Sequence, residues 1–239
     1  KTQDQLDLQA MHRVRSRLVR QRTSVINQIR TFLLDRGVAV RQGHHFLRAE
    51  LGDILATRTD VLSLPMIHLI EDLALDWRRL DERIDMISAE IERVASEDAG
   101  CTRLMTIPGI GPIISSATVA AIGGGNAFSK GRDFAAWMGI VPKQFSTGDR
   151  TILGSISKQG NRYLRTLFVQ AAWAVLVKPK SWERHGLKPW IEAAAKRLHP
   201  NVLAIALANK LARIAWAVLV KERNFEVITP DEMATSTAL

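Results

Sequence analysis

The sequence of 239 residues is short of cysteine and of long apolar runs, and each shortage excludes a class of protein. Cys101 is its one cysteine, so no disulfide can form within the chain, and a reducing compartment suits it. The longest apolar stretch, 202–220, is broken by Asn209, Lys210 and Arg213, so we expect no membrane-spanning helix. The chain is therefore predicted to be neither disulfide-stabilised nor embedded in a membrane.

Negative charge is also in short supply. The chain has 33 Lys and Arg residues against 24 Asp and Glu, which gives a formal net charge of +9. Its hydrophobic content of 46% is enough to bury a core and excludes a disordered chain. A basic balance favours a polyanionic partner, most commonly nucleic acid, although ribosome-associated and membrane-surface proteins are basic too.

Long helices are predicted in the first part of the chain. Residues 6–36 carry an apolar stripe at helical spacing, with arginines on the other faces, and 45–57 suits a shorter helix. The stripe consists of Met11, Val14, Leu18, Val25, Ile29 and Phe32. The fold class is therefore predicted to be mainly α, opening with coiled-coil-type helices.

A heptad seam runs through residues 64–98, which are rich in acidic residues. Its apolar positions alternate steps of three and four residues, the pattern by which helices pair in coiled coils. They are Ile70, Leu73, Trp77, Leu80, Ile84, Ile87, Ile91 and Val94. We expect this acidic helix to pack on the basic first helix, within one chain or across a dimer. The electropositive surface is then expected mainly after residue 100.

The second part of the chain, from Gly100, is predicted to form shorter helices. Residues 104–122 read as a short helix, a tight Pro-Gly-Ile-Gly-Pro turn and a helix of small residues, and Ser129 can cap a helix over 132–138. Further helices are expected at 160–177, 182–198 and 200–222, with a frayed tail over 227–239.

The Pro108–Pro112 turn could bind phosphate. Gly109 and Gly111, on either side of Ile110, permit unusual backbone angles and can expose N–H groups at a helix N-terminus. The turn is similar to the hairpin of helix-hairpin-helix modules, which grip the nucleic-acid backbone. An ordinary connection between two helices is the alternative interpretation.

A candidate nucleophile, Ser146, lies in the segment 141–165. A serine hydroxyl needs a base, a metal or preorganised cations to attack a phosphodiester, and Gly148 could let substrate approach. Basic and amide side chains suited to phosphate surround it in sequence: Lys143, Arg150, Lys158, Asn161, Arg162 and Arg165. Physics alone favours a loop serine with a local hydrogen bond, and Ser155 and Ser157 are equal candidates.

Two carboxylates at the start of the chain could bind a metal. Asp4 and Asp7 are three residues apart and so share a helix face, from which they could hold divalent cations such as Mg²⁺. The alternative is that they satisfy N–H groups in the first helical turn. Two aspartates would also be an incomplete site.

Three motifs together resemble transposases of the insertion-sequence-110 family, particularly its insertion-sequence-1111 branch. They are KTQDQLDLQAMHRVRSRL at 1–18, LMTIPGIGPIISSATVAAIG at 104–123 and FSKGRDFAAWMGIVPKQFSTGDRTILGSISKQGNRYLRTLFVQAA at 128–172. The resemblance covers essentially the whole chain. Its most specific part runs from Ser-x-Gly at Ser146 through Gly-Asn-x-x-Leu-Arg, which ends at Arg165.

The resemblance implies a DNA recombinase that uses a structured guide RNA and a covalent phosphoserine link. Ser146 matches the catalytic serine, and Asp4 and Asp7 match the last two acids of an Asp-Glu-Asp-Asp metal site. The implied division is the end of a RuvC-like nuclease domain at 1–10, a coiled-coil assembly region at 11–99, a transposase domain at 100–226 and the tail. Because the chain begins at Lys1 and lacks the first Asp and the Glu, we expect it to be a fragment with residues missing upstream.

We expect DNA, guide RNA and further copies of the chain as partners, in the bacterial cytoplasm at the nucleoid. Nucleic-acid contacts are expected at Gly109, Ile110, Gly111, Lys143, Arg150, Lys158, Asn161, Arg162 and Arg165. The alternative function is a non-catalytic helical scaffold that binds nucleic acid and oligomerises through the heptad seam.

Overall fold

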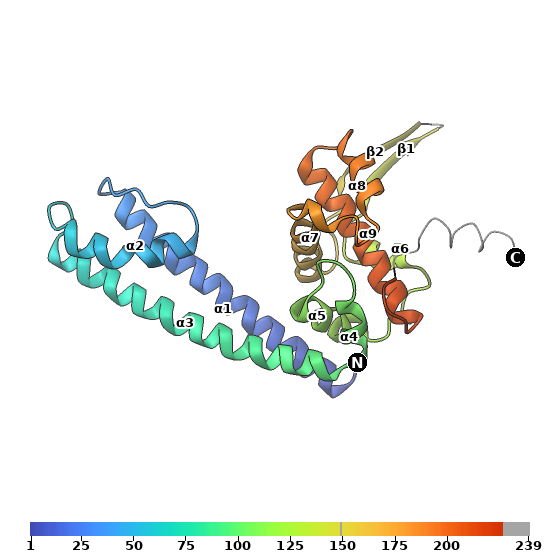
Figure 1. The fold of residues 1–239 in the computed structure, drawn as a ribbon, viewed down its shortest axis with the longest axis horizontal. Helices are drawn as coiled ribbons and strands as arrows, with labels where there is room; N and C mark the ends of the chain where they lie inside the picture. Colours follow the sequence, from blue (N-terminus) through green and yellow to red (C-terminus); the bar gives the residue numbers. More distant parts are fainter. Residues whose placement is uncertain (149, 227–239) are drawn as a thin grey trace, which may run out of the picture. The chain divides into compact units, whose positions relative to one another are not determined.

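The computed structural model describes residues 1–148 and 150–226, so the predicted tail at 227–239 lies outside the described residues. The fold is mainly α-helical, as predicted, with one antiparallel hairpin (Figure 1). The helices are α1 (Gln3–Leu34), α2 (His44–Thr57), α3 (Leu64–Glu97), α4 (Ala99–Met105), α5 (Pro112–Ile122), α6 (Gly131–Trp137), α7 (Arg162–Leu176), the 3-10 helix η1 (Pro179–Ser181), α8 (Lys188–Ala195) and α9 (Pro200–Val220). The strands are β1 (Pro142–Thr147) and β2 (Arg150–Ile156).

The chain divides into two compact units. One, called here the long-helix unit, is Ala10–Glu90, and the other, the C-terminal unit, joins Lys1–Gln9 to the described residues from Ile91 onward. The sequence placed the middle region at 11–99. The last turns of α3, from Ile91 onward, belong to the C-terminal unit.

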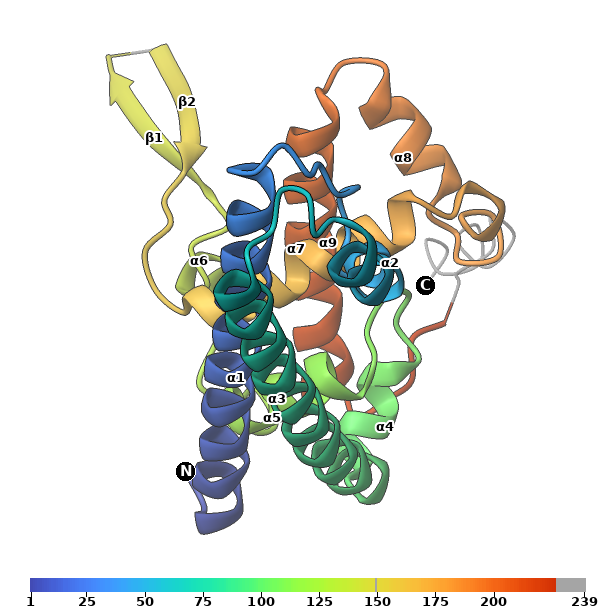
Figure 2. The same cartoon turned by 90° about the vertical axis from the view of Figure 1, so that its left-hand side faces the viewer.

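In the long-helix unit, α1 and α3 run side by side in opposite directions (Figures 1 and 2). The side of α1 that packs inward passes through Leu18, Ile26, Ile29 and Leu33, while Val14 of the predicted stripe is exposed. Arg22, a polar residue at helical spacing from Leu18 and Ile26, lies on the same inward side. Its guanidinium lies on that side because it forms an ion pair with Asp81 of α3 at 2.9 Å.

Only alternate positions of the heptad seam of α3 are fully buried. Every seventh residue is buried, since Ile70, Trp77, Ile84 and Ile91 are at most 4% exposed. The intervening positions, Leu73, Leu80, Ile87 and Val94, are half-buried. Since Arg22 and Arg15 of α1 bond Asp81 and Ser88 of α3, the basic and acidic helices pack within one chain.

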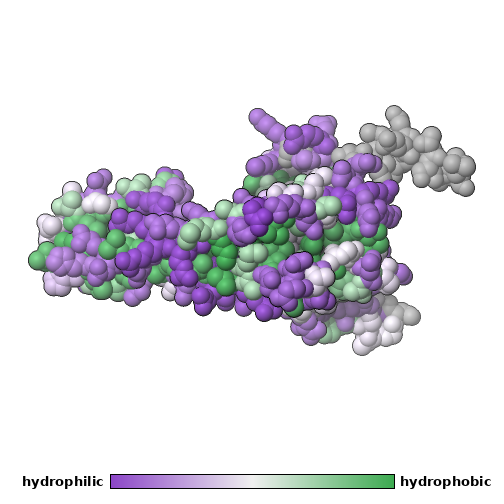
Figure 3. All heavy atoms as spheres, turned by 90° about the horizontal axis from the view of Figure 1, so that it is seen from below, coloured by the Kyte–Doolittle hydropathy of each residue, from purple (hydrophilic) through white to green (hydrophobic). Residues whose placement is uncertain are grey.

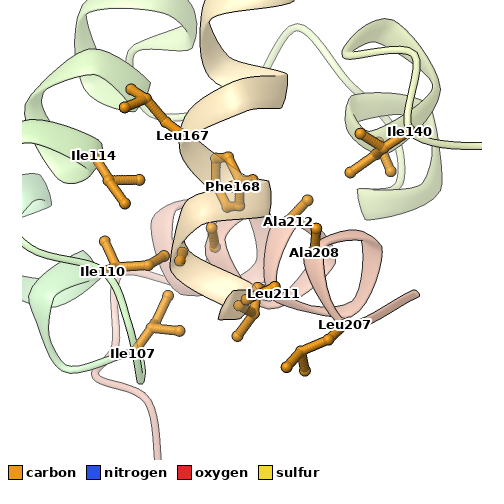
Figure 4. Close-up of a cluster of buried hydrophobic side chains, with 14 of the residues drawn as sticks. Ile107, Ile110, Ile114, Ile140, Leu167, Phe168, Leu207, Ala208, Leu211 and Ala212 are labelled. Carbon is orange, nitrogen blue, oxygen red and sulfur yellow. The ribbon is translucent and has the colours of Figure 1, made fainter. Parts of the chain in front are cut away.

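Helix α9 carries much of the core of the C-terminal unit. Its side chains Leu207, Ala208, Leu211 and Ala212 are fully buried and meet Phe168 of α7 in one apolar cluster (Figure 4). Alanines on both helices keep the side chains short, which lets the backbones approach closely. Helix α9 is also the one described helix long and apolar enough to cross a membrane, with half of its most apolar window buried. Its position in the core accounts for that composition.

Two local predictions in this unit were wrong. The predicted helix over 182–198 is a set of turns followed by α8, because Gly186 adopts a positive φ of 61° and Pro189 suits only a helix start. Ser129 does not cap α6: Lys130 is the N-cap residue, and the Ser129 hydroxyl donates to the Asp133 carboxylate at 2.8 Å.

Hydrophilic and hydrophobic residues are interspersed over the face drawn in Figure 3.

Candidate functional site

Ser146 lies near the end of strand β1 in a hairpin that is solvent-exposed on both faces. The residues of β1 are all exposed, and those of β2 are exposed up to its last residue. Figures 1 and 2 show the hairpin standing away from the helices of its own unit. The Ser146 hydroxyl accepts a hydrogen bond from the Gln144 amide at 2.7 Å. Its oxygen is thus held in place while its proton remains available for transfer.

The strand register divides the hairpin into two faces. Ser146 pairs with Thr151 and Gln144 pairs with Leu153, so these four residues share one face. Arg150 pairs with Thr147, the neighbour of Ser146, and therefore belongs to the other face. The cation nearest to Ser146 across the ladder consequently points away from the serine. Their closeness in sequence suggested that Arg150 would lie beside Ser146, but side chains alternate between the two faces along a strand and these two fall on opposite faces.

Two glycines lock the root of the hairpin to the helices. A Cβ at Gly139, after α6, would collide with the Gln159 carbonyl oxygen, and a Cβ at Gly160 would collide with that of Trp137. Both glycines have positive φ, 71° and 90°. The Lys158 amide, itself at a positive φ of 57°, donates to the Gly139 carbonyl at 3.1 Å. Only glycine allows the two segments to cross this closely, so the crossing fixes where the hairpin leaves the fold.

Of the side chains predicted to contact nucleic acid, two are already hydrogen-bonded within the fold and others are exposed. The Arg165 guanidinium donates to the Met138 carbonyl at 2.6 Å, which ties α7 to the end of α6. The Asn161 side chain accepts from the Leu164 amide at 3.0 Å and caps α7. Arg162 is exposed, as are Lys143 and Lys158 elsewhere in the segment. The exposed cations are therefore free to meet phosphate, while Arg165 and Asn161 already support the fold.

The Pro108–Pro112 turn owes its glycine at 109 to packing. Gly109 has φ +80°, and a Cβ there would lie 2.5 Å from the Ala171 carbonyl oxygen of α7. Ile110 is buried at 5% exposure, so its side chain anchors the turn in the core. Gly111 is the N-cap residue of α5 and has open space around it. Close packing on α7 is a sufficient reason for the first glycine but not for the second.

Asp4 and Asp7 lie at the start of α1 and are exposed. The Asp7 carboxylate accepts from the Gln3 amide at 3.1 Å. Within residues 1–148 and 150–226, no group of three or more His, Cys, Asp or Glu side chains is placed to hold a metal ion. The two aspartates therefore do not fit Mg²⁺ by themselves, since a hard cation takes more oxygen ligands than they provide.

Two residues that position Ser146 escaped the sequence reasoning. Gln144 touches its hydroxyl, and a strand assignment would have placed the two on one face by their spacing of two residues. Gly139 forms half of the hairpin root together with Gly160. Its signal was a glycine directly after a short helix, which is the usual place for a left-handed C-terminal residue.

Comparison with known proteins identifies the C-terminal unit. The profile of the transposase IS116/IS110/IS902 family matches residues 101–186, which run from α4 through the Ser146 hairpin and α7 to the turns after η1. This part of the chain is similar to that transposase family. The match includes the hairpin, its glycine root and the Pro108–Pro112 turn, so every candidate residue except Asp4 and Asp7 falls inside it.

Curated relatives of the family extend the similarity to almost the whole chain. A probable family 20 transposase of Pseudomonas aeruginosa is 42% identical over 223 residues, which cover 93% of this chain and 66% of that protein. The transposase of insertion sequence element IS1328 from Yersinia enterocolitica is 39% identical, covering 91% and 64%. That of IS1111A from Coxiella burnetii is 36% identical, covering 94% and 62%. The chain thus spans somewhat less than two thirds of the length of these relatives.

Proposed function

We propose that this chain is the assembly and strand-transfer part of a DNA transposase in which Ser146 attacks the scissile phosphate. The observation that carries the proposal is the placement of Ser146 within the transposase-matched region. The hydroxyl is exposed on a rooted hairpin, with its oxygen oriented by Gln144. A nucleophile for a polymer must stand clear of the fold, since a duplex cannot enter a closed pocket.

The proposed step is a transesterification. The Ser146 Oγ forms a bond to phosphorus, and the bond from phosphorus to one deoxyribose oxygen breaks. The hydroxyl proton passes to a base, and the departing deoxyribose oxygen takes up a proton. The phosphoserine link keeps the energy of the phosphodiester, so a second deoxyribose hydroxyl can later displace the serine and rejoin DNA.

Exposed cations assist this step by binding the DNA backbone. Lys143, Lys158 and Arg162 are exposed near the hairpin root or strands, and Arg150 lies on its second face. They bind phosphates that flank the reacting one, since Arg150 faces away from Ser146 and Lys158 and Arg162 lie beyond the root end of β2. The N–H groups around Gly111, at the start of α5, add a backbone contact to phosphate.

A divalent metal belongs to this proposal only in a protein that supplies further ligands. Asp4 and Asp7 provide two carboxylates, and a Mg²⁺ site would need additional oxygen donors from elsewhere. Such an ion would lend positive charge to the reacting phosphate. The guide RNA and the location at the bacterial nucleoid rest on family resemblance and are part of the same proposal.

Self-association is the remaining part of the proposal. The half-buried row of α3, represented by Leu80, would be covered by a second copy. Leu80→Asp should reduce the sedimenting species to a monomer while circular dichroism retains the helix signal. An oligomer of unchanged size would contradict association through α3. Ile84→Asp is unsuitable, because Ile84 is 4% exposed and its loss would unfold the helix pair.

The test of the nucleophile is a covalent adduct with DNA. A protein that contains this chain and the additional segments of its relatives is incubated with element-end DNA and denatured. A labelled strand should remain attached to the protein, and Ser146→Ala should abolish the attachment. Ser155→Ala is the matched control, since Ser155 is an exposed serine of the same hairpin and should leave the adduct intact. An adduct that survives Ser146→Ala would refute the assignment.

A non-catalytic nucleic-acid-binding scaffold is the alternative function for this chain taken alone. The observation that favours it is the absence of a three-ligand metal cluster among the described residues. Salt-dependent DNA binding without any cleavage would agree with it. Cleavage of DNA by this chain alone would exclude it.

A further inference from the structure

Helix α1 has an unusual charge composition along its length. Between Leu8 and Leu34 it contains arginines but no Asp or Glu. A helix with charge of one sign repels itself unless partners neutralise it. The long-helix unit provides partners for only some of these arginines.

Three of the arginines are satisfied within the unit. Arg15 donates to the Ser88 hydroxyl at 2.8 Å, and Arg22 pairs with Asp81 at 2.9 Å. Arg30 donates to the Gly43 carbonyl at 2.6 Å. All three are partly buried, and each connects α1 to α3 or to the segment before α2. The fold therefore holds all three guanidinium groups, and Arg22 has a carboxylate as its partner.

The other three, Arg13, Arg17 and Arg20, are exposed. Within the described part of the chain they form no ion pair, and Arg20 donates to the Ser16 carbonyl of its own helix at 3.2 Å. Spacings of four and three residues place them in a row on one face of α1. Exposed polar residues continue the row for about three more turns, at Ser24, Asn27, Gln28 and Thr31.

We infer that this row, called here the arginine ridge, is a second binding surface for the sugar-phosphate backbone of a nucleic acid. At 1.5 Å per residue, Arg13 and Arg20 are about 10 Å apart along the axis. That distance is close to the axial rise of about three nucleotides of one strand. The amide and hydroxyl groups farther along α1 are also typical phosphate donors.

A protein partner fits the ridge less well. Protein interfaces usually have an apolar or aromatic centre. The large apolar side chains that α1 exposes are instead isolated from one another by two turns or more: Leu6 at 47%, Val14 at 38% and Leu34 at 64%. The opposite charge is found on α3, whose exposed Glu71, Asp72 and Asp85 would repel phosphate. A nucleic acid would therefore be directed to the α1 side of the unit. The ridge adds a cationic surface before residue 100 to the one expected after it.

The ridge lies outside the residues matched by the transposase profile and is independent of Ser146. Its test uses the whole chain carrying Arg13→Gln, Arg17→Gln and Arg20→Gln together. Binding to a duplex DNA and to an RNA hairpin is titrated with salt. We expect affinity to fall by about tenfold or more. The slope of log affinity against log salt should become shallower by about 2.7 on B-DNA, since each lost phosphate contact contributes about 0.9.

The matched control changes Arg78, Arg79 and Arg83 of α3 to Gln, which removes the same charge from an acidic helix of the same unit. It should leave the salt slope unchanged. A third variant with lysine at 13, 17 and 20 should retain the slope, because it keeps the charge. A lysine variant that binds as poorly as the glutamine variant would mean that altered folding caused the loss, and would overturn the inference.

The two nucleic acids identify the source of the backbone. A loss of affinity confined to RNA assigns the ridge to a guide RNA, and a loss confined to DNA assigns it to the element or target DNA. A loss of affinity for both shows that the ridge binds the backbone of DNA and RNA alike. Salt slopes that are the same in the ridge variant and the α3 control, on both nucleic acids, would overturn the inference. That result would point instead to an acidic protein partner.

Discussion

The two glycines of the Pro108–Pro112 turn differ in whether the fold leaves room for a Cβ atom. Gly109 and Gly111 look equivalent in the sequence, but a Cβ would contact the α7 backbone only at 109. Their φ angles differ as well, at +80° and −108°. Substitutions at the two positions can therefore distinguish a packing role, at Gly109, from the proposed phosphate contact, at Gly111.

Gly109→Ala should destabilise the protein by about 2–4 kcal/mol, because it combines left-handed strain with a backbone collision. Gly111→Ala should change the free energy of unfolding by less than about 1 kcal/mol. Urea unfolding of the two variants measures both. If phosphate binds at the start of α5, Gly111→Ala should also weaken DNA binding. Equal destabilisation by the two changes would contradict the packing assignment.

His12 gives the long-helix unit a dependence on pH. Burial, and secondarily the Arg15 guanidinium, lower its pKa from 6.5 to about 4. The unfolded chain then takes up a proton at a higher pH than the folded one. Stability should be full above about pH 6.5 and should fall as the pH drops towards 4, by up to about 3 kcal/mol.

Unfolding of His12→Gln across this pH range tests the assignment. The variant should lose most of the decrease in stability between pH 6.5 and 4. His68→Gln, which changes an exposed histidine of α3, should retain the decrease. A pH profile that His12→Gln leaves unaltered would show that other groups cause the dependence.

At the scale of elements, one carboxylate joins the three helices of the long-helix unit. Asp81 of α3 accepts from Arg22 of α1 and from Arg48 of α2. It is 17% exposed, so the pairs are better shielded from water than ordinary surface pairs. Asp85, one turn farther along α3, is exposed.

Asp81→Ala should therefore lower the free energy of unfolding by about 1–3 kcal/mol, because it leaves two guanidinium groups without their acceptor. Asp85→Ala is the same chemical change one turn away and should cost less than about 0.5 kcal/mol. Thermal unfolding compares them directly. Similar midpoints for the two variants would show that Asp81 does not join the helices.

Local patterns predicted most of the elements, and contacts between distant segments explain where they failed. The helices over 3–34, 44–57 and 64–97 follow the apolar periodicity of the sequence. The hairpin at 142–156 was not predicted, and Ser146 was expected in a loop, because the strands are exposed and lack a clear alternation. Its root depends on a crossing of Gly139 and Gly160, which are 21 positions apart in the chain and so invisible to local reasoning.

The candidate site could be predicted only in part. Ser146 was found through a family motif, whereas its contact with Gln144 required the strand. Arg165 was expected to meet phosphate, yet its guanidinium bonds the Met138 carbonyl. Sequence spacing shows which charges are near one another along the chain. It cannot show which of these charged side chains will hydrogen-bond to backbone carbonyls of the folded chain.

At the scale of the whole molecule, the net charge of +9 is distributed unevenly. In the long-helix unit, Arg13, Arg17 and Arg20 of α1 are exposed on one helix and acidic residues on another. In the C-terminal unit, exposed cations accompany the Ser146 hairpin. Under the proposed function, the protein must hold nucleic acid at more than the bond it breaks. Two separate cationic surfaces meet that requirement better than one.

The most direct test of the account is to identify the residue that carries DNA. The covalent complex is trapped, its DNA is digested to a short remnant, and the protein is cleaved with trypsin for mass spectrometry. The remnant should be found on the peptide of residues 144–150, and fragmentation should place it on Ser146. A remnant on Ser155 or Ser157, in the following peptide, would contradict the assignment of Ser146 as the nucleophile.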